Sequence, residues 1–245
     1  MNQTIETILN HRSIRKFKPE KLSEEQVQTI VRSAQQASTS SYMMAYSIIG
    51  VTDEEVKDEL AEITMQSYVK NNGHLFIFCA DYHHVTSQAP QSTYDKMLAN
   101  LENSEHFLVA AIDAALAAQN AAIAAESLGL GICYIGSIRN NISRVDELLH
   151  LPDHVIPLFG MVVGVPAHQP EQKPRLPLKA VYHENSYKEH QQELNQFNEE
   201  ISHYYASRSE NTRTDTWTDQ MLRRFTKPMR MDVTDHVRKK GFNKK

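Results

Sequence analysis

A short run of anion-binding side chains stands near the start of the chain, at residues 11–15, His-Arg-Ser-Ile-Arg. The two guanidinium groups are planar, permanently charged forks that suit a phosphate or a carbonyl edge, and the serine and histidine add hydrogen-bond donors. Ile5, Ile8 and Leu9 precede the run with helical spacing, so it begins where a short helix should end. A solvated basic helix terminus has the same composition, because the helix dipole favours cations there. The run alone leaves both interpretations open.

Three further segments have residue types that could contact a ligand. Residues 38–41, Ser-Thr-Ser-Ser, place four hydroxyls between an expected helix and an expected strand, where they either bind a ligand or cap a helix end. The turn at residues 136–141 offers backbone amides and Arg139. The loop at residues 166–177 holds four of the nine prolines together with Lys173 and Arg175. Cations on such a rigid loop lose little conformational freedom on binding.

Hydrophobic patterning predicts the elements that position these segments. A capping box at residues 23–26 begins an amphipathic helix. Residues 47–51, 75–80, 132–135 and 155–165 are apolar runs of strand length. Between residues 81 and 103 the pattern weakens and predicts no definite element.

The strongest helix signal lies at residues 107–128, which are alanine-rich and almost uncharged apart from Asp113 and Glu126. Apolar residues on nearly every side predict burial all round, at a domain centre or a subunit interface. Beyond residue 181 no strand-length apolar run occurs, and a long polar helix carries a narrow apolar stripe that ends at Tyr204 and Tyr205. The basic tail that ends Lys239-Lys240 is expected to be solvated.

Composition excludes several classes of protein. Of the 245 residues, 40% are hydrophobic and 23% charged, which is ordinary for a globular protein. A net charge of -4 gives no global attraction to nucleic acid. We find no apolar run long enough to span a bilayer and no secretory leader pattern, so we expect a cytoplasmic protein without a membrane partner.

Neither metal chemistry nor cysteine chemistry is indicated. The pair His83-His84 has no partner at metal-ligand spacing, and Pro152 interrupts His150 and His154, so we assign no metal site. Cys79 and Cys133 stand inside apolar strand-like runs and are expected to be buried, which leaves a redox role open only as a minor alternative. A Rossmann dinucleotide site is excluded, because Gly129 and Gly131 follow a helix instead of preceding one.

Taken together, the motifs resemble the nitroreductase superfamily, and in particular its oxygen-insensitive NADPH nitroreductase and NADPH-flavin oxidoreductase group. The resemblance covers essentially the whole chain, including a C-terminal extension with residues 183–187 and 215–217. The motifs are His11-Arg-Ser-Ile-Arg15, Ser38 to Ser41, Ala124 to Gly131, Tyr134-Ile-Gly136, Leu158-Phe-Gly160 and Lys173-Pro-Arg-Leu-Pro177.

The resemblance implies an α+β nitroreductase-like, FMN-dependent fold, with a central mixed, mainly antiparallel sheet flanked by helices and a helical C-terminal extension. Residues 1–180 would form the FMN-binding core, and residues 181–245 the extension, which packs on the core or on a partner subunit. It further implies a homodimer that buries the long central helix and binds one FMN per subunit at the interface.

The resemblance also implies site residues. Arg208 and Arg213 match arginines that meet the 2′-phosphate of NADPH, and Glu210 between them departs from the group's pattern, which leaves the strength of the NADPH preference open. Which cation meets the FMN phosphate and which meets the ring edge also stays open. The residues that match FMN-binding positions are His11, Arg12, Ser13, Arg15, Ser38, Ser40, Ser41, Gln66, Tyr134, Ile135, Gly136, Ser137, Arg139, Lys173 and Arg175.

The implied function is that of an FMN-dependent NAD(P)H oxidoreductase. FMN carries the hydride chemistry, so we expect no protein nucleophile, acid or base; Arg15 is the first candidate to stabilise the reduced flavin. Electrons would pass by a ping-pong route from NADPH to nitroaromatics, quinones or free flavin, and the physiological acceptor stays open. The alternatives are a dedicated flavin reductase that supplies a partner monooxygenase and a non-catalytic flavin-binding sensor.

Overall fold

The computed structural model describes residues 1–208 and 212–245. The chain divides into two compact units, which are described separately. Met1–Pro170 and Arg230–Lys245 form the first, called the core unit below, and Glu171–Met229 form the second, called the helical unit.

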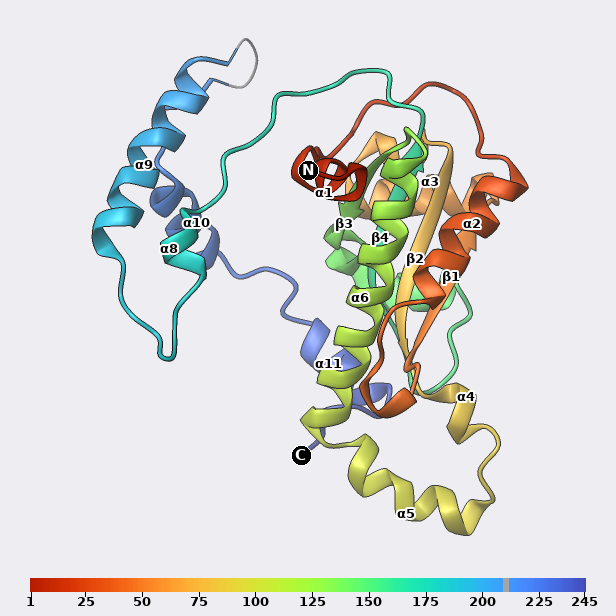
Figure 1. Ribbon diagram of the computed structural model, residues 1–245. Helices are drawn as coiled ribbons and strands as arrows, with labels where there is room; N and C mark the ends of the chain where they lie inside the picture. Colours follow the sequence, from red (N-terminus) through yellow and green to blue (C-terminus); the bar gives the residue numbers. More distant parts are fainter. Residues whose placement is uncertain (209–211) are drawn as a thin grey trace. The chain divides into compact units, whose positions relative to one another are not determined.

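A four-stranded sheet is the centre of the core unit (Figure 1). Its strand order is β1-β2-β4-β3, and every neighbouring pair is antiparallel. The register pairs Ile77 with Ile49 on one side and with Gly160 on the other, and shifts between Phe78 and Cys79. This confirms the predicted α+β fold with a mainly antiparallel sheet. The strands are β1 (Tyr46–Val51), β2 (His74–Asp81), β3 (Gly131–Ile135) and β4 (Val155–Gly164).

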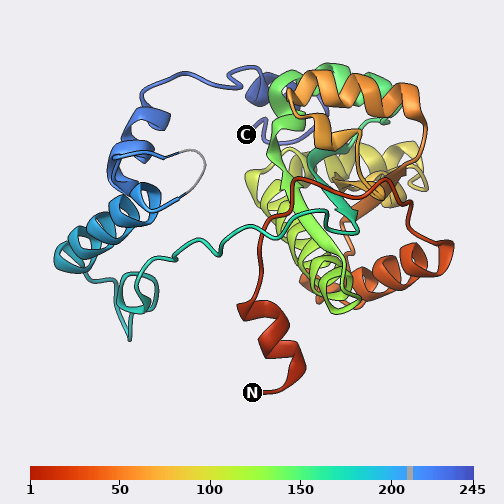
Figure 2. The same ribbon diagram turned by 90° about the horizontal axis from the view of Figure 1, so that it is seen from above.

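Helices cover both faces of this sheet, because side chains alternate along each strand. Phe76 and Phe78 of β2 pack with α2 (Glu24–Gln35) and α6 (Ser104–Ser127). Leu75, Ile77 and Cys79 point to the other face, where they pack with α3 (Glu54–Thr64) and α7 (Ile142–Leu148). Figure 2 shows the layers, with the orange α3 on one side of the sheet and the lime-green α6 on the other.

Helix α6 is buried on one side only. Its alanines form the side that packs into the core unit, whereas Leu108, Ile112 and Leu116 on the other side are about half exposed. A single chain therefore buries only one side of α6, and burial of the other side at a subunit interface stays a prediction. By length and composition alone α6 is long and apolar enough to cross a membrane, so the expectation that no apolar run has that length is also wrong. The packing of its alanines on the sheet explains this composition without a membrane.

The C-terminal tail is packed, and the expectation of a solvated tail is wrong. Val237 and Phe242 are buried, and the ammonium group of Lys240 binds Asp146 and the Leu151 carbonyl. Hydrophobic patterning missed this because the local sequence does not distinguish a lysine that binds a buried carboxylate from a lysine in solvent. Residues 230–245 accordingly belong to the core unit, whereas the sequence-based division placed them in the extension.

Shorter elements connect these layers. Helix α5 went unpredicted because its periodicity is weak and Pro90 precedes it without a side-chain cap. The remaining elements of the core unit are α1 (Gln3–Leu9), η1 (Ser40–Tyr42), η2 (Ser67–Val69), α4 (His83–Thr86), α5 (Gln91–Leu101), η3 (Gly136–Asn141) and α11 (Val233–Lys239).

The helical unit contains α8 (Leu178–Val181), α9 (Gln191–Ala206) and α10 (Trp217–Phe225). Phe197, Ile201 and Tyr205 form the predicted apolar stripe on α9 and are buried. The Trp217 ring of α10 packs edge-on against Phe197.

Candidate functional site

The segment at residues 11–15 lies beside strand β3 and extends the sheet locally. Ser13 forms a parallel bridge with Ile132, and the Ile14 amide donates to the Ile132 carbonyl at 2.8 Å. The buried Ile14 side chain lies over Gly131, where a Cβ atom would collide with it. Because side chains of an extended backbone alternate, neighbouring residues of this segment point to different sides.

Ser13 and Arg15 share one of these sides with Tyr68 and Cys133. Arg15 lies close to the Tyr68 hydroxyl, and Ser13 and Tyr68 both lie close to the Cys133 thiol. Burial raises the pKa of Cys133, while Arg15 opposes the rise. The thiol is thus protonated at neutral pH, and its part here is to pack and hydrogen-bond.

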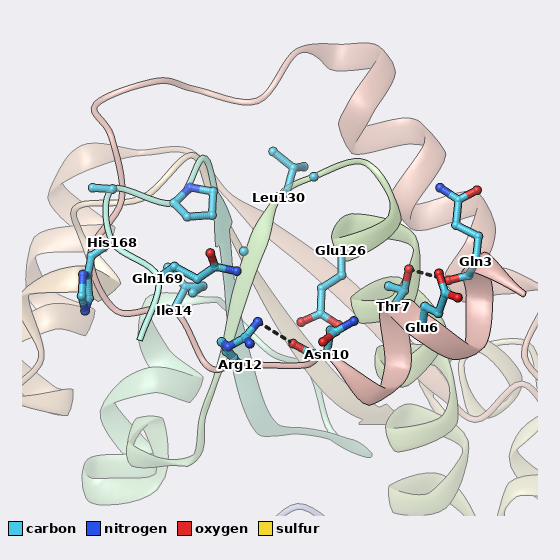
Figure 3. A pocket seen from close by; sticks show the side chains of 14 residues that line it. Gln3, Glu6, Thr7, Asn10, Arg12, Ile14, Glu126, Leu130, His168 and Gln169 are labelled. Atoms are coloured by element: carbon cyan, nitrogen blue, oxygen red, sulfur yellow. Dashed lines mark hydrogen bonds between the residues drawn. The ribbon is translucent and has the colours of Figure 1, made fainter. Parts of the chain in front are cut away.

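Arg12 lies on the other side, in a pocket of about 630 Å³ (Figure 3). Its guanidinium donates to the Asn10 carbonyl at 3.2 Å. His11 Nδ1 lies 2.6 Å from Glu126 at the end of α6, which ties the segment to that helix. Figure 3 shows Arg12 and Glu126 lining the pocket beside α1 and the loop that carries His168 and Gln169.

Two arginines flank Gly136, the first residue of η3. A Cβ atom at Gly136 would lie 3.4 Å from Arg139 and 3.8 Å from Arg230. Burial and the nearby charge of Arg230 lower the pKa of Arg139, which also donates to the Leu158 carbonyl. Arg230 donates to the Asn140 side chain at 3.0 Å. Two like charges held this close favour an anion beside them.

The residues around Arg15 and those around Gly136 are connected through η2 and η3. Ser137 donates to the Gln66 side chain at 3.2 Å, and Gln66 directly precedes the η2 turn that carries Tyr68. Tyr134 donates its hydroxyl to the Ala118 carbonyl of α6 at 2.8 Å, and burial raises its pKa. Ile135 is buried in the sheet.

The serines at 38, 40 and 41 lie on an exposed loop before β1. Ser41, Tyr42 and Met44 have left-handed backbone, with φ of 48°, 60° and 48°. Asp113 of α6 accepts hydrogen bonds from the Ser40 and Ala45 amides.

The other predicted cations belong to the helical unit. Lys173, Arg208 and Arg213 each lie 5.8 to 5.9 Å from the centre of the Tyr205 ring. Arg175 donates to the Lys173 carbonyl at 2.8 Å. Lys173 and Arg175 also line an apolar pocket of about 630 Å³ with Trp217. Glu210, the expected departure, lies outside the described residues.

Sequence reasoning missed four residues that support the site. Arg230 stands in a tail that was expected to be solvated, and no sequence signal marks it. No sequence pattern distinguishes Tyr68 from its neighbours. Asp113 and Glu126 did carry a signal, because they are the two charged residues of an otherwise apolar stretch.

The antiparallel sheet with helices on both faces defines an α+β protein, and the arginines that flank Gly136 suit an anion. Two family models match the chain, "Nitroreductase family" over residues 8–165 and "Nitroreductase family, C-terminal domain" over residues 173–245. The chain belongs to the nitroreductase family.

Relatives match over the full length. An "FMN reductase (NADPH)" of Bacillus subtilis is 53% identical over 250 residues and covers 100% of both chains. The solved structure of B. megaterium NfrA1 is 55% identical with a TM-score of 0.95, over 99% of this chain and 100% of that one. The NADPH:FMN oxidoreductase from Vibrio harveyi, solved with NAD+, is 38% identical with a TM-score of 0.90 over 100% of both chains.

Proposed function

We propose that this nitroreductase-family protein is an FMN-dependent NADPH oxidoreductase that passes two electrons by a ping-pong route to nitroaromatics, quinones or free flavin. Two observations support it together, the full-length similarity to an FMN reductase (NADPH) and the arginines that flank Gly136. The first indicates the chemistry, and the second indicates where a phosphorylated ring fits.

The residues of the core unit fit FMN by their donor set. A flavin phosphate needs charged donors, and its ring edge needs neutral and charged hydrogen-bond donors. Arg15 and Arg139 supply permanent charge, and Ser13 and Ser137 supply hydroxyls. Gly136 leaves space between Arg139 and Arg230 that a Cβ atom would reduce.

When bound, FMN supplies the hydride chemistry. The chain's part is to bind, orient and stabilise charge. Arg15 is assigned to stabilise the negative charge of the reduced cofactor, because a guanidinium stays protonated at all physiological pH values. The Tyr68 hydroxyl lies close to the Arg15 guanidinium, which opposes the rise that burial causes in the pKa of Tyr68. His11 and Arg12 are assigned to the cofactor's polar end, with Glu126 holding the imidazole.

The donor is assigned to the helical unit. Arg208 and Arg213 stack over the aromatic rings of α9, and an arginine pair of this kind suits the 2′-phosphate of NADPH. Lys173 and Arg175, which the resemblance places at the FMN, line the pocket within the same unit. A non-catalytic sensor needs no second phosphate site, so the pair Arg208 and Arg213 favours the enzyme.

The direct test is purification and reconstitution. We expect a yellow protein that binds FMN and oxidises NADPH in the presence of a quinone or a nitrofuran. A colourless protein that cannot be reconstituted with FMN would contradict the proposal.

The name of the B. subtilis relative favours a narrower second function, a dedicated flavin reductase. Such an enzyme would turn over free FMN far faster than any nitro substrate under the same NADPH concentration. Comparable turnover of both acceptors would support the broader reductase.

We also propose a cytoplasmic homodimer. The exposed apolar residues Leu108, Ile112 and Leu116 are spaced four apart and thus follow one side of α6, as a helix interface requires. Light scattering after size exclusion should give twice the chain mass of 28.0 kDa, and Ile112→Glu should shift the mass toward one chain.

A further inference from the structure

The loop before β1 holds an unusual conformation although most of its side chains are exposed. Ser41, Tyr42 and Met44 all have positive φ, a region that residues with a side chain adopt uncommonly. Ser40, Ser41 and Tyr42 are exposed, so burial of the loop does not offset this strain. Strained backbone persists only where its surroundings impose it, and it is concentrated at functional sites.

The element that imposes it is Asp113. This carboxylate is 0% exposed, and its two oxygens accept from the Ser40 amide at 2.9 Å and the Ala45 amide at 3.1 Å. The two amides flank the three left-handed residues, so one side chain fixes both ends of the loop. Two turn bonds accompany them, one from the Met43 amide to the Ser40 carbonyl and one from the Tyr46 amide, the first of β1, to the Met44 carbonyl.

The position of Asp113 in the core holds these two hydrogen bonds in place. The residue lies on α6, between Ala110 and Ala114, which pack in the core of the unit. A buried carboxylate is costly unless it is hydrogen-bonded, so the protein gains from keeping both amides in place. The loop's amides in turn have a carboxylate partner in place of water. Each side of the contact therefore stabilises the other.

We propose that Asp113 is a positioning residue for cofactor binding, which fixes the residue 40–45 loop and thereby places the hydroxyls of Ser40 and Ser41. This inference rests on the proposed function, and it takes Ser40 and Ser41 as FMN-binding residues because the resemblance to the nitroreductase superfamily implies that role for both. Asp113 acts through the loop and is not itself a ligand. Because the hydrogen bonds to Asp113 order the loop before FMN binds, little conformational freedom is lost on binding.

The test is the dissociation constant of FMN for the full-length protein, measured by flavin fluorescence with Asp113→Asn. Asparagine keeps one oxygen that can accept a hydrogen bond from one of the two backbone amides. Its NH2 group then faces the other backbone N–H, from which it cannot accept a hydrogen bond. We expect at least about tenfold weaker binding, or roughly 1.4 kcal/mol. Asp146→Asn is the matched control, because Asp146 is also buried but binds His236 and Lys240. That variant should bind FMN within about twofold of the unchanged protein.

A double-mutant cycle separates positioning from a general structural effect. If Asp113 acts through the serines, then the Asp113→Asn effect should largely vanish in a Ser40→Ala, Ser41→Ala background. An undiminished effect there, or equal affinities for Asp113→Asn and Asp146→Asn, would overturn the proposal. If the two variants had equal affinities, the unchanged protein would still bind FMN and the proposed function would stand. A failure of the unchanged protein to bind FMN would overturn both.

If Asp113→Asn does not fold, amide hydrogen exchange in the unchanged protein tests whether the loop is ordered before FMN binds. The Ser40 and Ala45 amides should be protected without FMN, as the β1 amides are, because the loop is preformed. Protection that develops only after FMN is added would overturn the proposal.

Discussion

Replacement of Arg15 by alanine should weaken FMN binding by at least about tenfold. Arg15 is exposed, so its removal leaves no buried charge behind. The substitution therefore destabilises the FMN complex and leaves the free protein's stability unchanged. A hydrogen bond to a charged group contributes about 1.5 to 3 kcal/mol, and each 1.4 kcal/mol is a factor of about ten. Solvent exposure of Arg15 favours the lower end of that range.

The assay is a titration of FMN into apo-protein, followed by the quenching of flavin fluorescence. Lys16→Ala is the matched control, since it removes an adjacent exposed positive charge from the same segment. The thermal unfolding midpoints of both variants should equal that of the unchanged protein. Only the Arg15 variant should lose affinity.

Two results would refute this reasoning. An unchanged dissociation constant for Arg15→Ala would remove Arg15 from the cofactor site. An equal loss in Lys16→Ala would show that net charge, and not a specific contact, sets the affinity.

Three further predictions concern the donor site and stability. Arg213→Ala should raise the KM for NADPH about tenfold more than the KM for NADH, because it removes a charge-assisted contact to the 2′-phosphate; equal changes in steady-state assays would exclude that role. Asp146→Asn should lower the free energy of unfolding in urea by about 3 kcal/mol, since it breaks a buried ion pair with Lys240; an unchanged value would mean that the tail is not held by this contact. Burial lowers the pKa of His74 to about 4, so the unfolded chain takes up its proton first and stability falls as the pH drops from about 6.5 toward 4. His74→Gln should flatten that part of the urea-midpoint profile, and an identical slope would contradict the shift.

The fold was largely predictable from the sequence because its main elements are strongly patterned. The strands at residues 75–80 and 155–165 are continuous apolar runs, and the long helix is alanine-rich and almost uncharged, so their patterns identify them clearly. Helix α5 was missed because nothing caps it and its periodicity is weak. The packed tail was missed because its anchors pair with residues about 90 positions away, such as Asp146 with Lys240.

The candidate site was predictable as a set of residues but not as an arrangement. The run at residues 11–15 suggested one wall, whereas the extended backbone sends Arg12 and Arg15 to different sides. Arg230 approaches Gly136 through tertiary packing alone, so no local pattern could indicate it. Asp113 and Glu126 are the instructive pair. An isolated carboxylate in an apolar helix has to find a partner, and each of these binds a segment of the site.

The central claim is that electrons pass from NADPH to an acceptor through FMN bound by this chain. The most direct measurement is rapid mixing of the FMN-loaded protein with NADPH, followed by addition of a quinone. We predict stoichiometric bleaching of the flavin absorbance by NADPH and its full return with the quinone. Bound flavin that NADPH does not bleach, or that the quinone does not reoxidise, would contradict the account.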